Sequence, residues 1–376
     1  MKVIPMYLPQ FHQIPENDEW WGEGFTEWTN VKKAKPLFEG HYQPRVPLNK
    51  NYYDLSDIET LRWQAKTAKE HGIYGFCFYH YWFNSKLLLE KPMELLLEHP
   101  EIDLKYCISW ANENWTNQWV SKSNTILMSH DFKDEKDWIE HFDYLLQFFQ
   151  DPRYIQEDGK PLMTIYVPHH IPKLNKMLKL WNEMAINYGF KGLKFLYQNP
   201  RSHFDKTMDK SLFDYGIEFQ PGFSVYLNSS KQHQKLMVWG PKISTWLKQT
   251  FNIHFGIFNQ QRKVGKDDYD KTWNIILNQR PDRENMIPTA FVDWDNTPRR
   301  QERGNVYIGA TPDKFKKYFS QLVSNTKKYY KSDKIFVFAW NEWAEGGYLE
   351  PDEKYQYGYL NAIKEALIEN DELENL

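Results

Sequence analysis

The sequence predicts an α/β fold, most simply a (β/α)8 TIM barrel with long insertions after the first and sixth strands. Eight short buried runs of β-branched or aromatic residues recur, and amphipathic helical patterns lie between many of them. A doubly wound open sheet is the alternative, but it needs a phosphate-binding glycine loop, and the sequence has none. The expected strands are Val3–Leu8, Tyr74–Tyr79, Lys105–Trp110, Pro161–Val167, Lys194–Gln198, Tyr215–Phe219, Ile287–Asp293 and Ile335–Trp340.

Helical periodicity between these runs predicts the covering helices. Gly72 and Gly189 each follow such a pattern, and glycine often ends a helix. The expected helices are Asp57–His71, Lys86–Glu98, Glu135–Phe149, Lys173–Tyr188, Pro312–Tyr330 and Tyr355–Glu369.

Two segments exceed a minimal barrel. Pro9 to Tyr53 is rich in Trp, Pro, Gly and Asn and shows little helical pattern, whereas Phe223 to Asn285 contains one helical stretch, Asp267–Asn278. Loops of this length inside a compact domain are usually functional or lid-like. We expect residues 1–376 to form a single barrel domain, with a frayed acidic tail from Glu369.

Composition narrows the functional classes. The chain has 47 basic and 50 acidic residues, so no global field recruits nucleic acid or an anionic membrane. No run approaches the roughly 18 apolar residues of a membrane span, and a strand-like run begins at once, which leaves no room for a signal peptide. Cys77 and Cys107 lie within expected strands and are read as reduced core residues. These features predict a cytoplasmic protein without an integral membrane segment or a nucleic acid partner.

The most informative stretch follows the last expected strand. There, Glu342 and Glu345 stand three residues apart, framed by tryptophans on a glycine-containing loop. Two carboxylates on such a loop can lie within the several ångströms that acid/base or nucleophile/acid pairs need at a glycosidic bond. The alternative is a tryptophan-rich strand end with two solvated glutamates.

Polar and aromatic side chains also follow nearly every other expected strand. In a barrel the carboxyl ends of the strands build the active site, so we expect these side chains to bind a glycan. We expect eight of them, Tyr7, His12, Trp28, His80, Trp110, Glu113, Asp293 and Trp294, to share one pocket with the glutamate pair. The full set of candidate substrate contacts is Tyr7, Gln10, His12, Glu27, Trp28, His80, Trp82, Trp110, Asn112, Glu113, Gln198, Glu218, Asp293, Trp294, Asn341 and Trp343.

Several of these residues have a structural alternative. His80 is equally consistent with a core histidine, and Glu113 with a helix cap. His169 and His170 fit a loop pair better than a metal site, because no third ligand is fixed by spacing. We expect neither a metal nor a cofactor.

Five motifs closely resemble the bacterial WbsX family, which is labelled a glycosyltransferase of lipopolysaccharide or capsule biosynthesis and also a glycoside hydrolase family 99-like domain. The resemblance covers essentially the whole chain. The motifs are Tyr7-Leu-Pro-Gln-Phe-His12, Glu19-Trp-Trp-Gly-Glu-Gly-Phe-Thr-Glu-Trp-Thr-Asn-Val31, Gly75-Phe-Cys-Phe-Tyr-His-Tyr-Trp-Phe83, Trp110-Ala-Asn-Glu-Asn-Trp115 and Trp340-Asn-Glu-Trp-Ala-Glu-Gly346.

The resemblance implies a (β/α)8 enzyme that acts on α-mannosides with retention. It implies that Glu342 deprotonates the 2-hydroxyl of the sugar and that Glu345 protonates the leaving oxygen. Ala344 departs from the family 99 pattern, which usually has a histidine there, and this departure concerns the leaving-group side. We expect enclosure by Trp343 and Tyr348 to keep the acid protonated, and Asn341 or backbone donors to keep the base ionised.

Two alternative functions remain open at this level. The first is a sugar-nucleotide-dependent glycosyltransferase, with Asp293 and Asp295 on a divalent cation as in the short D-x-D motif and Arg299 on phosphate. The second is a glycan-binding barrel without catalytic activity.

Overall fold

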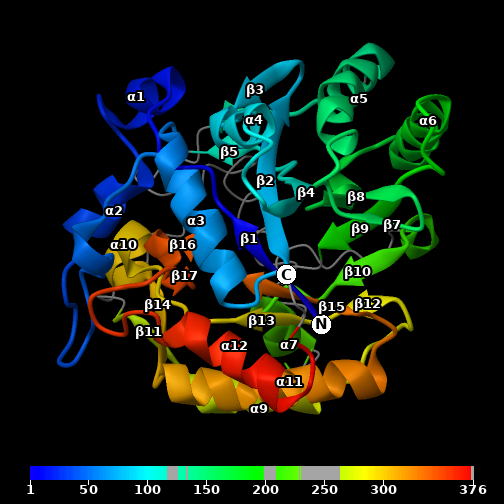
Figure 1. Cartoon of the computed structure of the whole chain (residues 1–376). Helices are drawn as coiled ribbons and strands as arrows, with labels where there is room; N and C mark the ends of the chain where they lie inside the picture. The colour runs from blue at the N-terminus through cyan, green and yellow to red at the C-terminus, as the bar shows by residue number, and fades with distance from the viewer. Residues whose placement is uncertain (117–125, 133, 199–208, 228, 230–262, 374–376) are drawn as a thin grey trace, which may run out of the picture.

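Eight parallel strands form the centre of the computed structural model, which describes residues 1–116, 126–132, 134–198, 209–227, 229 and 263–373 (Figure 1). Each strand lies beside its neighbour in sequence, and β15 returns to pair with β1. The fold class is therefore confirmed as a barrel. The strands are β1 (Lys2–Tyr7), β2 (Gly75–Phe83), β4 (Lys105–Trp110), β8 (Lys160–Ile165), β9 (Lys194–Gln198), β10 (Tyr215–Ile217), β12 (Met286–Ile287), β13 (Thr289–Phe291) and β15 (Lys334–Phe338).

The seventh strand closes the ring, and it is split at Pro288 into β12 and β13. The Ile287 carbonyl accepts from the Glu218 amide on the β10 side, and the Pro288 carbonyl accepts from the Phe336 amide on the β15 side. Proline has no N–H to donate, which interrupts the ladder where the strand passes from one neighbour to the other. The sequence predicted one continuous strand here.

Helices cover the outside of this ring (Figure 1). Asp57 and Asp134 accept from backbone amides at the starts of α3 and α5, and Thr311 does so at α11 ahead of Pro312. Among the described residues no helix has the length and apolarity of a membrane span. The helices are α1 (Pro15–Trp21), α2 (Glu27–Lys33), α3 (Ile58–Glu70), α4 (Lys91–Glu98), α5 (Glu135–Phe149), α6 (Leu174–Asn187), α7 (Gly222–Leu227), α9 (Tyr269–Asn278), α10 (Thr297–Arg300), α11 (Pro312–Tyr329) and α12 (Gly358–Glu369).

Several boundaries differ from the prediction. Lys86–Glu98 divides into a short strand, β3 (Lys86–Leu88), and α4, because β2 runs on past Tyr79 and folds back to pair with β3. Helix α12 starts at Gly358 instead of Tyr355, and α9 is preceded by a strand, β11 (Gly265–Asp268).

The insertions contain more structure than their sequences suggested. Pro9 to Tyr53 holds α1 and α2, although little helix was expected there. Of the segment Phe223 to Asn285, residues 228 and 230–262 lie outside the described residues.

Shorter pairings complete the fold: β5 (Trp115–Thr116) with β6 (Ile126–Met128), β7 (Gln156–Glu157) with β8, β11 with β14 (Asn305–Ile308), and β16 (Asn341–Glu342) with β17 (Gly347–Tyr348).

Cys77 and Cys107 occupy neighbouring positions on β2 and β4, and both are buried and free.

Candidate functional site

The two glutamates lie on a tight hairpin that follows β15, at the carboxyl-end mouth of the barrel. Glu342 ends β16, and Glu345 ends a single 3-10 turn, Trp343–Glu345. Gly346 follows in the left-handed region with φ +68°, where a side chain would be strained, and allows the chain to turn into β17. The hairpin thus places both carboxylates on the face where barrels carry their active sites.

Arg299 of α10 binds both carboxylates at once. Its Nη2 lies 3.1 Å from Glu342 Oε1, and its Nη1 lies 3.1 Å from Glu345 Oε1. Its Nε lies 3.2 Å from Glu27 Oε2, which belongs to α2 in the first insertion. The side chain of Arg299 is only 10% exposed. One guanidinium therefore holds three carboxylates together at the mouth.

Burial raises the pKa of the Glu342 carboxyl, and the nearby charges of Glu345 and Glu27 raise it further, while Arg299 opposes them. Burial also raises the pKa of Tyr81, whose hydroxyl accepts from the Gln10 side chain at 3.0 Å. Tyr81 is close enough to Glu342, Arg299 and Glu27 for their charges to act on it. The charge of each group therefore affects the ionisation of the others.

Asn341 fixes the backbone next to Glu342. Its amide accepts from the Leu8 N–H at 2.8 Å and donates to the Leu8 carbonyl at 3.0 Å, so it ties the end of β15 to the end of β1. The expectation that Asn341 keeps Glu342 ionised is not supported, because its amide is engaged with Leu8. Asn341 is a positioning residue.

The indole of Trp343 is bound by a buried carboxylate, that of Glu350. Its indole N–H donates to Glu350 at 2.7 Å, and its ring stacks on Tyr348 at 3.7 Å. Glu350 also accepts from Tyr53 and Gln64, and burial raises its pKa to about 7. Trp343 is almost fully buried, as is Trp28, which packs against it.

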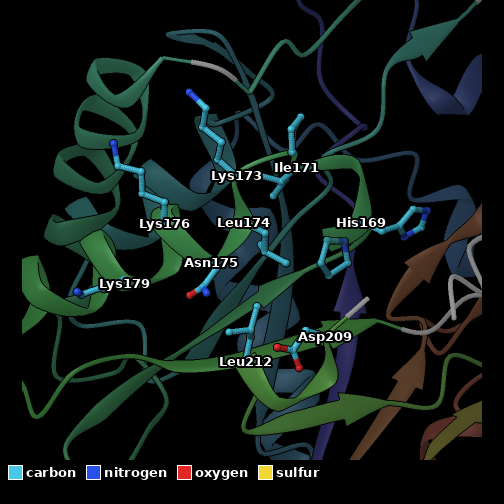
Figure 2. Close-up of a pocket in the computed structure, with 11 residues that line it drawn as sticks. His169, Ile171, Lys173, Leu174, Asn175, Lys176, Lys179, Asp209 and Leu212 are labelled. Carbon is cyan, nitrogen blue, oxygen red and sulfur yellow. The ribbon is translucent and has the colours of Figure 1, made fainter. Parts of the chain in front are cut away.

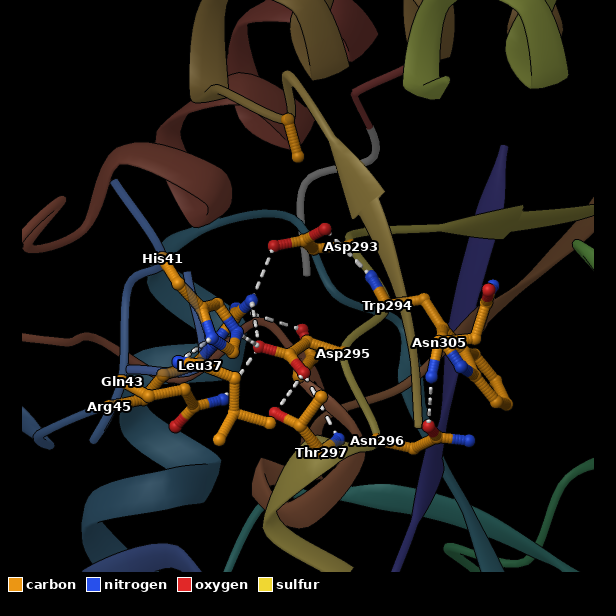
Figure 3. Close-up of polar contacts among 12 residues, drawn as sticks. Leu37, His41, Gln43, Arg45, Asp293, Trp294, Asp295, Asn296, Thr297 and Asn305 are labelled. Atoms are coloured by element: carbon orange, nitrogen blue, oxygen red, sulfur yellow. Dashed lines mark hydrogen bonds and ion pairs between the residues drawn. The ribbon is translucent and has the colours of Figure 1, made fainter. Parts of the chain in front are cut away.

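The D-x-D residues are occupied by the protein's own donors (Figure 3). Asp295 accepts from His41 and Gln43 on one oxygen and from Thr297 on the other, and Asp293 accepts from Arg45 at 2.8 Å. The binding of a divalent cation by both aspartates stays a prediction, and in this structure their side chains bind these donors instead. Arg299, expected on phosphate, contacts the three glutamates.

The same cluster holds the Glu345 loop. The Asp295 amide donates to the Glu345 carbonyl at 2.7 Å, and Arg45 donates to the Gly346 carbonyl. A Cβ at Gly346 would lie 3.0 Å from both the Arg45 guanidinium carbon and the Asp295 nitrogen. This close packing fixes the position of Glu345.

A row of buried and partly buried aromatic rings borders the carboxylates. Consecutive ring contacts of 5.3 to 6.2 Å connect residues at or after the ends of four strands with β2, in the order Trp294, Phe338, Phe219, Tyr166 and Tyr79. The charge of Glu345 acts on Tyr166, and that of Glu342 acts on Tyr79. Beneath them, Gln198 lies within 3.4 Å of the Tyr79 hydroxyl and accepts from Ser109. Trp294 and Gln198 thus lie in or against this row of rings, and their contact with a substrate stays a prediction.

Four predicted contacts face away from the mouth. His80 and His141 of α5 share a 2.9 Å hydrogen bond, Trp82 donates to Asp137, and Trp110 packs on His141 and Trp181. Tyr7 donates to Gln64 of α3. Successive side chains of a strand point to opposite faces, which turns His80 and Trp82 outward and Tyr79 and Tyr81 inward.

The remaining candidates are spread around the barrel. Glu218 accepts from Tyr330, which follows α11, and burial raises its pKa to about 8. Asn112 holds both backbone groups of Val167, at 2.8 and 2.7 Å. His12 is buried, with its pKa lowered by burial, and the charge of Glu113 acts on Tyr166.

The expectation of one pocket shared by eight residues with the glutamate pair stays a prediction, and six of the eight are buried or bound by other side chains. Tyr7, Trp28, His80 and Trp110 lie in the core, His12 is buried, and Asp293 is bound to Arg45. Sequence reasoning missed Arg299 as the bridge and Tyr79, Tyr81 and Tyr166 as the lining. The alternation of Tyr79 and Tyr81 with His80 was the available signal.

A separate cavity of about 710 Å³ lies beside the start of α6 (Figure 2). Its lining includes His169, Lys173, Lys176, Lys179 and Asp209 but neither glutamate of the pair. Lys176 and Lys179 are paired with Glu135 and Glu183. His169 and His170 form a 3-10 turn, in keeping with a loop pair.

The fold was compared with solved protein structures. The fold resembles the GH99 endo-alpha-mannosidase from Bacteroides thetaiotaomicron, with a TM-score of 0.56 and 14% identity over 99% of this chain and 98% of that one. A structure described as a glycoside hydrolase-like protein matches equally, at TM-score 0.56 and 14% identity over 97% and 93% of the two chains.

Two sequence relatives, each named "Uncharacterized protein WxcX" and from two strains of Xanthomonas campestris pv. campestris, are 34% identical over 374 residues. The match covers 97% of this chain and 49% of each relative, so the chain spans about half their length. The model of the family described as Glycosyltransferase WbsX matches residues 3–363, and the chain therefore belongs to the WbsX family.

Proposed function

We propose that this protein cleaves or transfers an α-linked, mannoside-like glycan with retention, using Glu342 and Glu345, in bacterial surface-polysaccharide metabolism. One observation carries the proposal. Two carboxylates from a single hairpin approach the same guanidinium at the barrel mouth, beside partly buried tyrosines and Trp294. Paired carboxylates bordered by aromatic rings suit a glycosidic bond and the apolar faces of sugars.

In the proposed reaction Glu342 takes the proton of the 2-hydroxyl while that oxygen attacks the anomeric carbon. Glu345 gives its proton to the leaving oxygen, and an anhydrosugar forms. Water or an acceptor hydroxyl then opens the anhydrosugar, with Glu345 accepting its proton and Glu342 returning a proton to the 2-oxygen. The raised pKa of Glu342 makes it a stronger base, and a base works best when its pKa lies near the operating pH.

Transfer from a sugar nucleotide is the second candidate, favoured by the description of the family as glycosyltransferases. In this structure Asp295 accepts from His41, Gln43 and Thr297 on its two oxygens, so cation binding there would replace these contacts. A single-domain organisation and a cytoplasmic location remain predictions.

The test is product analysis with two substrate panels, one of defined α-linked glycans and one of sugar nucleotides, each with and without a strong chelator. We expect release of a product with retained anomeric configuration from an α-mannoside, undiminished by the chelator, because neither glutamate role uses a metal. The Glu353→Gln variant, altered at an exposed glutamate of the following loop, is the control and should keep full activity. Turnover of sugar nucleotides alone, abolished by the chelator, would overturn the proposal.

A further inference from the structure

Glu27 reaches the site from a part of the chain far from the glutamate pair. It is the first residue of α2, in the insertion after β1, and its carboxylate contacts the Arg299 Nε at 3.2 Å and the Asn30 amide at 3.4 Å. Its side chain is 12% exposed. The insertion thus adds a third carboxylate to the site.

The charges of this cluster do not balance. Glu27, Glu342 and Glu345 face one guanidinium, so within the described part of the chain the ion pairs of this cluster carry a net charge of −2 when all three carboxylates are ionised. Like charges in a buried site raise the free energy of the fully ionised state, and protons are then shared among coupled groups. Glu342, the most buried of the three at 4% side-chain exposure, has the raised pKa.

Among the described residues, the other titratable groups near the cluster are three tyrosines and one glutamate. Tyr79 and Tyr81 come from β2, and Tyr166 follows β8. Glu113 follows β4, and its charge acts on Tyr166. Burial raises the pKa of all three tyrosines, so they stay neutral at physiological pH, and Arg299 is the cation that contacts the pair.

We propose that Glu27 and Arg299 are positioning residues that set the net charge of the glutamate pair, and through it the pH range in which the pair can work. Glu27 binds the Nε edge of the guanidinium, which leaves the two terminal nitrogens for Glu342 and Glu345. The link to catalysis rests on the proposed function, whereas the charge coupling does not.

Substitutions of Glu27 and Arg299 should change the ionisation of Glu342 in opposite directions. Glu27→Gln removes a negative charge and leaves Arg299 to the pair, so ionisation of Glu342 becomes easier. Arg299→Gln removes the cation that contacts the pair among the described residues, so ionisation of Glu342 becomes harder. If the ion pairs only fastened α2 and α10 to the hairpin, both substitutions would lower stability without opposite effects on titration.

The test is a carboxyl titration of the full chain by NMR with ¹³C-labelled glutamate side chains, which needs no substrate. Glu342→Gln identifies the Glu342 signal by its loss. We expect the midpoint of that signal to fall by at least half a pH unit in Glu27→Gln and to rise by at least one unit in Arg299→Gln. Arg299→Lys, which keeps the charge, should recover at least half of the rise.

Arg62→Gln is the matched control, because Arg62 also faces two carboxylates, Glu59 and Glu101, but at the surface. It should leave the Glu342 signal unmoved. An unmoved signal in folded Glu27→Gln overturns the charge coupling, even where Arg299→Gln fails to fold.

Once turnover is measurable, the pH profile of kcat/KM should shift in the same directions as the titration. Titration shifts without matching shifts in the profile would contradict the catalytic role of the pair while leaving the charge coupling intact. The two proposals therefore fail separately.

Discussion

Asn112 and Asn341 do the same structural work at two strand ends. Each is fully buried, and each side-chain amide pairs with both the N–H and the C=O of a residue just after a neighbouring strand, Val167 after β8 or Leu8 after β1. Each is followed by a glutamate, Glu113 or Glu342, so the amide fixes the direction in which the glutamate leaves its strand.

Replacing either asparagine with leucine should therefore be costly. The substitution leaves a buried backbone donor and acceptor unpaired, which we expect to lower the free energy of unfolding by about 2–4 kcal/mol in each variant. Urea unfolding of Asn112→Leu and Asn341→Leu measures this. A loss below about 0.5 kcal/mol in both would show that the two amides do not bear on stability.

The sequence predicted which types of residue lie near the strand ends, but only in part the direction in which each side chain points. The glutamate pair was proposed because it directly follows a buried run, and Gln198 and Trp294 because they end or follow expected strands. His80 and Trp82 were misplaced because the strand was read as a run of ring-bearing residues without its two-residue alternation. Asn341 and Trp343 were read as ligand contacts, whereas their hydrogen bonds hold Leu8 and Glu350.

At the scale of elements, the first insertion is fastened to the seventh and eighth strands by buried polar contacts. Arg45 donates to Asp293 and to the Gly346 carbonyl, and His41 and Gln43 bind Asp295 (Figure 3). These contacts span about 250 positions in sequence, so no local pattern could reveal them. They explain how an irregular insertion delivers Glu27 to a defined place.

Arg45→Met should destabilise the protein strongly, because it leaves the buried Asp293 carboxylate without its cation. Removal of one partner of a buried ion pair typically costs about 3–5 kcal/mol. Thermal or urea unfolding of Arg45→Met, Asp293→Asn and the double variant forms the cycle. We expect the double variant to be more stable than the sum of the single losses allows, and strict additivity would refute the coupling.

The contact between β2 and α5 contains two buried histidines, His80 and His141. Burial lowers the pKa of His80 to about 3 and also lowers the pKa of His141. Below the unfolded-state value of about 6.5 the unfolded chain binds protons that the folded chain refuses. The two histidines therefore do not lower the free energy of unfolding above pH 6.5, and they lower it progressively as the pH falls towards 3.

Each histidine should add about 1.4 kcal/mol per pH unit to this loss. The free energy of unfolding, measured by urea between pH 7 and 4.5, should fall less steeply by about that amount in His141→Gln than in the wild type. Equal slopes in the wild type and His141→Gln would contradict this account of the interface.

The regular elements were predictable because their signals are local. The strands Lys105–Trp110 and Lys194–Gln198 and the helix Glu135–Phe149 have the expected bounds, and the other barrel strands differ at their ends. The division of Lys86–Glu98 and the interruption at Pro288 depend on pairing with distant or folded-back strands, which periodicity does not report.

At the scale of the whole molecule, barrel closure turns distant segments into one site. The Arg299–Glu27 contact joins residues 272 positions apart, and the aromatic row joins residues from Tyr79 to Phe338. The sequence predicted that strand ends would meet at one face, since every barrel has this property. It did not predict that a single arginine would collect three carboxylates, because that arrangement depends on how α2 and α10 pack against the hairpin.

The central claim is that Glu342 and Glu345 carry out glycosyl chemistry in different roles. The most direct test compares the turnover of an activated aryl α-mannoside with that of an unactivated α-mannoside in the wild type, Glu342→Gln and Glu345→Gln. A general acid typically contributes about 10²–10⁴-fold, and an activated leaving group needs little of it. Glu345→Gln should therefore lose the unactivated substrate but keep activity on the aryl one, and Glu342→Gln should lose both. Turnover of both substrates at wild-type rates in both variants would contradict the claim.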